Sequence, residues 1–235
     1  MVQMMTGEIF EKPRTLRIRF RKTGALCYIS HLDLMRTMTR VMKRASLPIR
    51  YTGGYNPKPH LVFSAPLPVG AESPREFVDI AVLCDVDTAE VMRRLNDGLP
   101  ADLAVDAVYY ADTKFSDITA AEYAIAIHTA NADAALASVL AKRLGDRPMI
   151  VCKRTKSGEK DVDVSPAVLS ASGEYDAVEG IILLTVRLAA DSGSFLNPDY
   201  LIGYLKEKEK ILCVESESYA VVRTHLYDAN GKDFS

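Results

Sequence analysis

Residues 15–22 read TLRIRFRK, and this stretch decides the predicted fold. From residue 16 to residue 21, apolar side chains occupy the even positions and arginines the odd ones, the period-two pattern of a half-buried β-strand. We therefore predict a strand whose apolar face packs on a core and whose outer face carries Arg17, Arg19 and Arg21.

The next element is predicted to be a helix that starts at Ser30. Asp33 follows three residues later, the spacing of a capping pair at a helix N-terminus. Apolar residues recur at helical spacing from residue 34 to 45, and Pro48 ends the element. The opposite face of this helix is basic and carries Arg36, Arg40, Lys43 and Arg44.

The rest of the chain completes one pattern and then repeats it. In the first half, two strands, a helix and a strand are predicted at 61–65, 77–85, 88–96 and 103–111. In the second half, strands are predicted at 122–129, 149–154, 180–188 and 218–227, and helices at 132–144 and 197–208. We therefore expect an α+β protein of two tandem ferredoxin-like (βαββαβ) sandwiches with antiparallel sheets, a basic domain at 14–112 and an acidic one at 121–229.

Composition narrows the class of protein. The chain has 235 residues, enough for two domains of ordinary size. No apolar run approaches the roughly 18 residues that span a membrane, and residues 1–13 lack an apolar signal core, so we expect a cytoplasmic protein with no membrane partner. The four cysteines are far apart in sequence, and we predict neither a metal nor any other cofactor.

Charge is distributed very unevenly. Residues 12–60 hold twelve basic residues and a single acidic one, Asp33, so the rest of a chain of net charge −2 carries about −13. The basic residues of this segment are Lys12, Arg14, Arg17, Arg19, Arg21, Lys22, Arg36, Arg40, Lys43, Arg44, Arg50 and Lys58. Such a segment is typical of a surface that binds a polyanion, because each Lys or Arg on a phosphate backbone releases counterions.

A loop rich in glycine and proline follows, with the sequence YTGGYNPKPH at 51–60. Its glycines let the backbone approach a ligand closely, and tyrosines stack on nucleobases. The predicted nucleic-acid-binding residues are therefore Arg17, Arg19, Arg21, Arg36, Arg40, Lys43, Arg44, Tyr51, Tyr55, Asn56 and Lys58. Three alternatives stay open: a solvated helix face, a stiff loop whose tyrosines pack on the sheet, and a basic strip neutralised by acids of the second half.

Two histidines, His31 and His60, are the candidates for catalysis. They could serve as base and acid at an RNA 2′-hydroxyl and its leaving oxygen. The alternative is that each forms structural hydrogen bonds to backbone, and no catalytic residue is assigned.

Several motifs together resemble a known family. They read YISHLDLMR at 28–36, RASLP at 44–48, GYNPKP at 54–59 and PLPVGAES at 66–73, with VRT at 222–224. This combination is similar to the radical-SAM-linked family of uncharacterised bacterial proteins. Lys58 stands where many relatives have His, which weakens a catalytic role for the loop.

The resemblance implies a partner. Members of that family are encoded beside a radical SAM enzyme or fused to its C-terminus, often near genes for a ribonuclease of the E/G type and for ribosomal proteins. This chain lacks the three closely spaced cysteines of a radical SAM cluster, so the partner would perform any radical chemistry.

Three functions follow from these residues and this resemblance. The first is an accessory or substrate-recognition protein for that enzyme, with no activity of its own, which binds ribosomal or transfer RNA. The second is a metal-independent RNA endonuclease that uses His31. The third is a protein-interaction module that makes no contact with nucleic acid.

Overall fold

The computed structural model describes residues 9–155, 158–191 and 193–235, and the chain divides into two compact units, Met1–Phe115 and Ser116–Ser235. Both units mix α-helices with antiparallel strands, so the α+β class is confirmed. The described part of the chain contains four α-helices, and no helix within it is long and apolar enough to cross a membrane.

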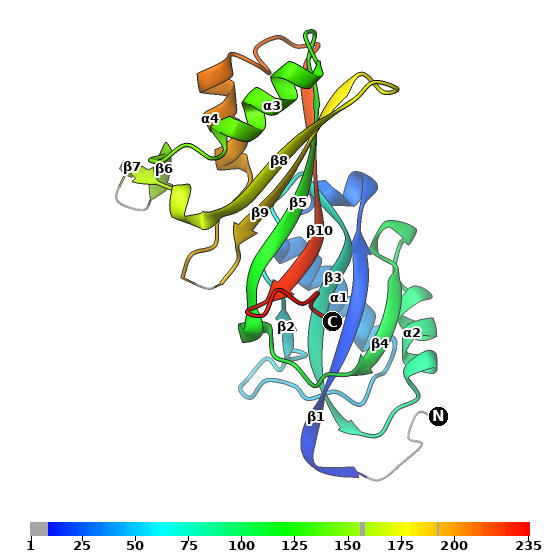
Figure 1. Ribbon diagram of the computed structural model, residues 1–235. Coiled ribbons are helices and arrows are strands. Elements are labelled where there is room, and N and C mark those ends of the chain that lie inside the picture. Colours follow the sequence, from blue (N-terminus) through cyan, green and yellow to red (C-terminus); the bar gives the residue numbers. More distant parts are fainter. Residues whose placement is uncertain (1–8, 156–157, 192) are drawn as a thin grey trace. The chain divides into compact units, whose positions relative to one another are not determined.

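The first unit follows the order strand, helix, two strands, helix, strand (Figure 1). These elements are β1 (Ile9–Lys22), α1 (His31–Arg44), β2 (Leu61–Phe63), β3 (Ala71–Cys84), α2 (Thr88–Asn96) and β4 (Val105–Tyr110). β1 pairs with β3 on one side and β4 on the other, and β2 pairs with the far edge of β3. All three pairings are antiparallel.

One apolar core holds this unit together. The even positions of β1, Leu16, Ile18 and Phe20, are fully buried, as the alternation predicts. Apolar residues of α1 and α2 belong to the same core cluster, so both helices cover the same face of the sheet. The α1 residues in this cluster are Leu34, Met38, Val41 and Met42, and those of α2 are Val91 and Leu95.

The start of α1 is fixed by the predicted cap. The Ser30 hydroxyl accepts a hydrogen bond from the Asp33 backbone N–H at 3.1 Å and donates one to the Asp33 carboxylate at 2.7 Å. These contacts satisfy an N–H group that the first helical turn leaves unpaired. Ser46, just beyond the helix, has a φ of 52°, so the chain leaves α1 through a left-handed residue.

The second unit contains a four-stranded sheet, a separate hairpin and two helices (Figure 1). The elements are β5 (Ile118–His128), α3 (Ala134–Arg143), β6 (Ile150–Thr155), β7 (Gly158–Asp163), β8 (Val168–Asp176), β9 (Ile181–Ala189), α4 (Asp199–Glu209) and β10 (Ser218–Asp228). The strand order in the sheet is β10-β5-β9-β8, and all its pairs are antiparallel. β6 pairs only with β7 in the described structure.

This arrangement corrects the prediction for the second half. The stretch 149–154 was expected to join the sheet, whereas the strand that lies beside β9 is β8, which was not predicted. The sequence of β8, VLSASGEYD, is small and polar and has few residues of high strand propensity. Gly173 in β8 is needed for packing, because a Cβ there would lie 2.6 Å from the Ala137 carbonyl oxygen of α3.

Candidate nucleic-acid interface

A groove on the first unit brings together two of the predicted binding segments. It has a volume of about 360 Å³ and lies between the exposed side of α1 and the end of the 51–60 loop. Its lining residues are Leu32, Met35, Arg36, Thr39, Arg40, Lys58, Pro59 and Leu61. Arg36 and Arg40 are one helical turn apart, and Lys58 joins them from a segment distant in sequence. Three predicted cations thus surround one concave surface.

The floor of this groove was not predicted as part of a site. Leu32 is 49% exposed, although it is a large apolar side chain on a helix. Met35 was expected in the core stripe, and the structure places it in the groove instead. The signal in the sequence is the spacing: Leu32 and Met35 are three residues apart and Arg36 follows directly, so apolar and basic side chains share one side of α1.

The charges at the groove are only partly compensated. Arg36 forms an exposed ion pair with Asp33 at 3.1 Å. Hydrogen bonds from Ser30 and then Arg36 hold the pKa of Asp33 below its ordinary value. Among the residues that the structure describes, Arg40 and Lys58 form no ion pair.

The loop that supplies Lys58 is closed by its own backbone. The Thr52 N–H donates to the Lys58 carbonyl at 2.8 Å, and the Lys58 N–H donates to the Thr52 hydroxyl at 3.1 Å. Gly54, at the tip, has a φ of 104°, a conformation that residues with a Cβ rarely adopt. Tyr55 and Asn56 are exposed, Tyr55 completely. The alternative that Tyr55 packs on the sheet is therefore wrong.

Tyr51 lies at the base of the same loop. It forms an isolated antiparallel bridge with Pro59 and keeps 41% of its surface exposed. The two tyrosines of the loop are therefore both accessible, one at its base and one near its tip.

Arg17 does not lie on an accessible surface, and this corrects its prediction. Its side chain is fully buried, and its guanidinium donates to both carboxylate oxygens of Asp79, at 2.8 and 2.9 Å. It also donates to the hydroxyl of Thr113 at 2.6 Å and to its carbonyl at 3.0 Å, and it stacks on the Phe115 ring at 4.5 Å. A residue held on every side in this way stabilises the unit and is closed to a phosphate.

The other two arginines of β1 differ from Arg17 and from each other. Arg19 is partly exposed and forms an ion pair with Asp106 of β4 at 2.8 Å. Arg21 is exposed, and its backbone N–H donates to the Ala104 carbonyl at 3.0 Å. The structure therefore does not present the three side chains as one free basic face.

Lys43 and Arg44 lie at the C-terminal end of α1, and both are exposed. Arg44 lines a second hollow of about 710 Å³ beside the end of α2. The other residues that line it are Val41, Ala45, Ser46, Arg94, Asp97 and Gly98. Arg44 is the basic residue of α1 that lines this hollow, and Arg94 and Asp97 lie beside it.

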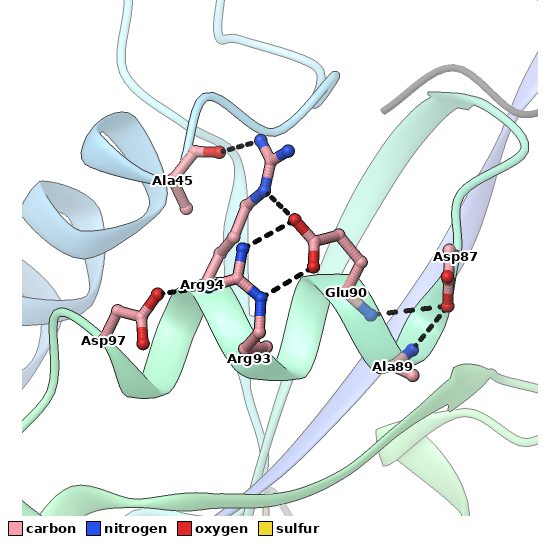
Figure 2. A network of polar contacts seen from close by, with 7 residues as sticks. All are labelled: Ala45, Asp87, Ala89, Glu90, Arg93, Arg94 and Asp97. Carbon is pink, nitrogen blue, oxygen red and sulfur yellow. Dashed lines mark hydrogen bonds and ion pairs between the residues drawn. The ribbon is translucent and has the colours of Figure 1, made fainter. Parts of the chain in front are cut away.

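The arginines of α2 are neutralised by their own helix, as Figure 2 shows. Glu90 accepts hydrogen bonds from Arg93 at 2.8 Å and from Arg94 at 2.7 Å. These bonds, Arg93 first, lower the pKa of Glu90 to about 2. Arg93 also pairs with Asp97 at 2.7 Å, and Arg94 donates to the Ala45 carbonyl at 3.3 Å. The two arginines of α2 are therefore already paired with acids, whereas the charges on the basic side of α1 are only partly compensated.

The two candidate histidines belong to different surroundings. His31 is exposed at the start of α1, and its ring meets Phe63 edge to face with centroids 5.1 Å apart. It borders a narrow pocket together with Lys22 and Glu76, both of which are buried. His60 is exposed, and its backbone N–H donates to the Arg50 carbonyl. No contact in the described structure joins the two side chains as an acid–base pair.

Within the ranges that the structure describes, no three His, Cys, Asp or Glu side chains are grouped so that they could hold a metal ion. Cys27 and Cys84 are buried, and Cys152 and Cys213 are exposed.

Comparisons with known proteins add one clear finding. A family model described as "Uncharacterized protein conserved in bacteria (DUF2344)" matches residues 15–198, most of the chain. No curated protein matches. Among solved structures, a DypB variant in complex with manganese is 10% identical over 91% of this chain and 93% of that one, with a TM-score of 0.19. DyPB from Rhodococcus jostii RHA1 is 10% identical over 92% and 94%, with a TM-score of 0.20. Scores this low carry no argument about fold or function.

Proposed function

The chain belongs to the DUF2344 family of proteins conserved in bacteria, and from this premise we propose that it binds RNA through the groove beside α1. The observation that carries the proposal is the convergence of Arg36, Arg40 and Lys58 on one concave surface. Phosphate groups favour such a set because each contact with a Lys or Arg releases counterions, and Arg pairs with two phosphate oxygens at once.

The distribution of ion pairs supports this location. The sheet arginines Arg17 and Arg19 are paired with acids of the same unit, whereas Arg40 and Lys58 have no ion pair among the described residues. Lys43 and Arg44 continue the same side of the helix and complete the proposed contact surface. Tyr51, Tyr55 and Asn56 would contact bases from the adjoining loop, and Arg21, exposed near the end of β1, would be a further phosphate contact.

We further propose that the RNA is ribosomal or transfer RNA and that the protein presents it to a radical SAM enzyme. This part rests on the motifs at 28–36, 44–48, 54–59 and 66–73, which resemble the radical-SAM-linked family. The partner would supply the cluster cysteines and the reaction, and the protein would act with it in the cytoplasm. Its own role is recognition of the substrate.

The finer description of the fold is also a proposal. Each unit would be a ferredoxin-like sandwich, and the two units would be the domains at 14–112 and 121–229. The strand order β4-β1-β3-β2 in the first unit and β10-β5-β9-β8 in the second supports it, because both place the first and third sheet strands at the centre. The β6–β7 hairpin is then an insertion.

The test is binding of the full chain to total bacterial RNA across a salt series. We expect affinity to fall steeply with salt, and we expect Arg36→Glu combined with Arg40→Glu to abolish binding. The matched control reverses two exposed lysines of the second unit, Lys142→Glu with Lys206→Glu, and should leave binding nearly unchanged. Binding that survives the α1 double variant would refute this surface as the site.

The same samples separate the two other functions. Cleavage of the RNA in EDTA that is lost in His31→Ala would establish the endonuclease. Absence of RNA binding at low salt, together with co-purification of a radical SAM protein, would establish the protein-interaction module.

A further inference from the structure

We infer that the groove beside α1 is a slot for unpaired nucleobases, so that the ligand is single-stranded RNA and not a duplex. This inference rests on the proposed function and makes it more specific. It follows from a feature that phosphate binding alone does not need, which is the apolar floor between the cations.

The floor consists of Leu32, Met35, Pro59 and Leu61. A site that contacts only phosphates needs donors and positive charge, and apolar side chains next to it would displace water from the phosphates without offering a hydrogen bond in return. The flat face of a base is apolar, in contrast, and packs against such a surface. A floor of this kind ringed by Arg36, Arg40 and Lys58 matches a base with its flanking phosphates.

A duplex cannot use this floor. In A-form RNA the bases are stacked inside the helix, and proteins reach mainly the phosphates and the 2′-hydroxyls of the minor groove. A duplex laid across α1 would therefore set its charged backbone over Leu32 and Met35. An unpaired segment can turn its bases into the groove and leave its phosphates at the rim.

The adjoining loop provides a second stacking surface. Tyr55 is fully exposed, and its loop is closed by the two hydrogen bonds between Thr52 and Lys58. Lys58 thus links the groove to the segment that carries the tyrosine. An exposed aromatic ring on such a loop suits the next base of a flexible strand.

The experiment compares two labelled RNAs with equal numbers of phosphates in one buffer. One is an oligouridine of about twelve nucleotides, within the range of single-strand binding sites, and the other is a perfectly paired duplex. We expect the full chain to bind the oligouridine at least about tenfold more tightly.

Two variants then separate stacking from charge. Leu32→Ala and Tyr55→Ala should each weaken oligouridine binding about fivefold or more, with an unchanged salt slope, and should leave duplex binding unaffected. Arg40→Gln should instead reduce the salt slope by about one for both RNAs. The matched control is Val139→Ala, which truncates another exposed apolar residue, in α3, and should change neither quantity.

Each outcome decides a different point. Equal or tighter binding of the duplex, with no effect of Leu32→Ala, would overturn the slot and leave the RNA-binding function standing. No salt-dependent binding of either RNA would overturn both. Preference for the oligouridine that Leu32→Ala removes would establish the slot.

Discussion

Removal of the Arg17 guanidinium tests whether this residue stabilises the first unit instead of belonging to the predicted binding surface. The substitution Arg17→Met keeps most of the length and apolar volume of the side chain and deletes the guanidinium. It therefore removes the paired hydrogen bonds to Asp79 and both contacts to Thr113. Asp79, whose side chain is only 13% exposed, is left without its counter-ion.

The expected cost follows from this burial. Breaking a buried ion pair by removing one partner costs about 3–5 kcal/mol, because the remaining charge stays desolvated. This is a large part of the total stability of about 5–15 kcal/mol that is typical of native proteins. The second substitution Asp79→Leu in the same chain should recover most of the loss, because an apolar pair replaces the orphaned charge.

Hydrogen exchange of the full chain measures this effect locally. Amides of β1 and β3 in Arg17→Met should exchange at least about 100-fold faster than in the wild type, and peptides of β5 and β9 supply the internal reference. The salt slope of RNA binding should not change, since Arg17 is not accessible. A change in exchange below about tenfold, or a slope reduced by one, would refute the structural role.

Three further predictions concern other features. Glu90→Gln should lower the melting temperature near neutral pH, because the fold stabilises the ionised form of Glu90, whose pKa is lowered to about 2. The difference in melting temperature between this variant and the wild type should shrink as pH falls from about 4.5 toward 2, where Glu90 becomes protonated. Asp33→Asn should tighten RNA binding and steepen its salt dependence, because it frees Arg36; an unchanged slope would count against Arg36 as a phosphate contact. Gly173→Ala should cost about 1–3 kcal/mol in urea unfolding through its clash with α3, whereas Gly203→Ala, where a Cβ meets nothing within 4 Å, should cost nothing.

Local patterns in the sequence were sufficient to predict the strands and helices of the first unit. The alternation in 15–22 correctly predicts the buried face of β1, and the cap at Ser30 correctly predicts the start of α1. Both signals act over a few residues, within reach of a single strand or helical turn. The α2 helix was predicted at 88–96, its observed bounds, because its cap and apolar spacing are also local.

These local patterns could not predict contacts between residues that are far apart in sequence. Arg17 and Asp79 are 62 residues apart, and nothing near Arg17 in sequence distinguishes it from Arg19 or Arg21. The strand β8 was missed for a related reason. Its small residues have little propensity for a strand by themselves, and Gly173 is explained only by the helix that packs on it.

The candidate site shows the same limit. The cations of α1 and the 51–60 loop were both predicted, but as separate features. Their convergence depends on the path of the chain between residues 45 and 61, which has many prolines and no periodic pattern. The groove floor was missed because exposed apolar residues such as Leu32 resemble core residues until the packing is known.

The difference between elements whose arginines are paired with acids and those whose arginines are not bears most directly on function. Acids of the first unit neutralise Arg17 and Arg19 on the sheet, and acids within α2 neutralise Arg93 and Arg94. Like charges one turn apart on a helix destabilise it, and a fold that needed only stability would pair or remove them. In the described structure, Arg40 has no ion pair and lies one turn from Arg36, at the rim of an apolar groove. The positive charge of Arg40 therefore lies where an anionic ligand with an apolar face would offset that cost.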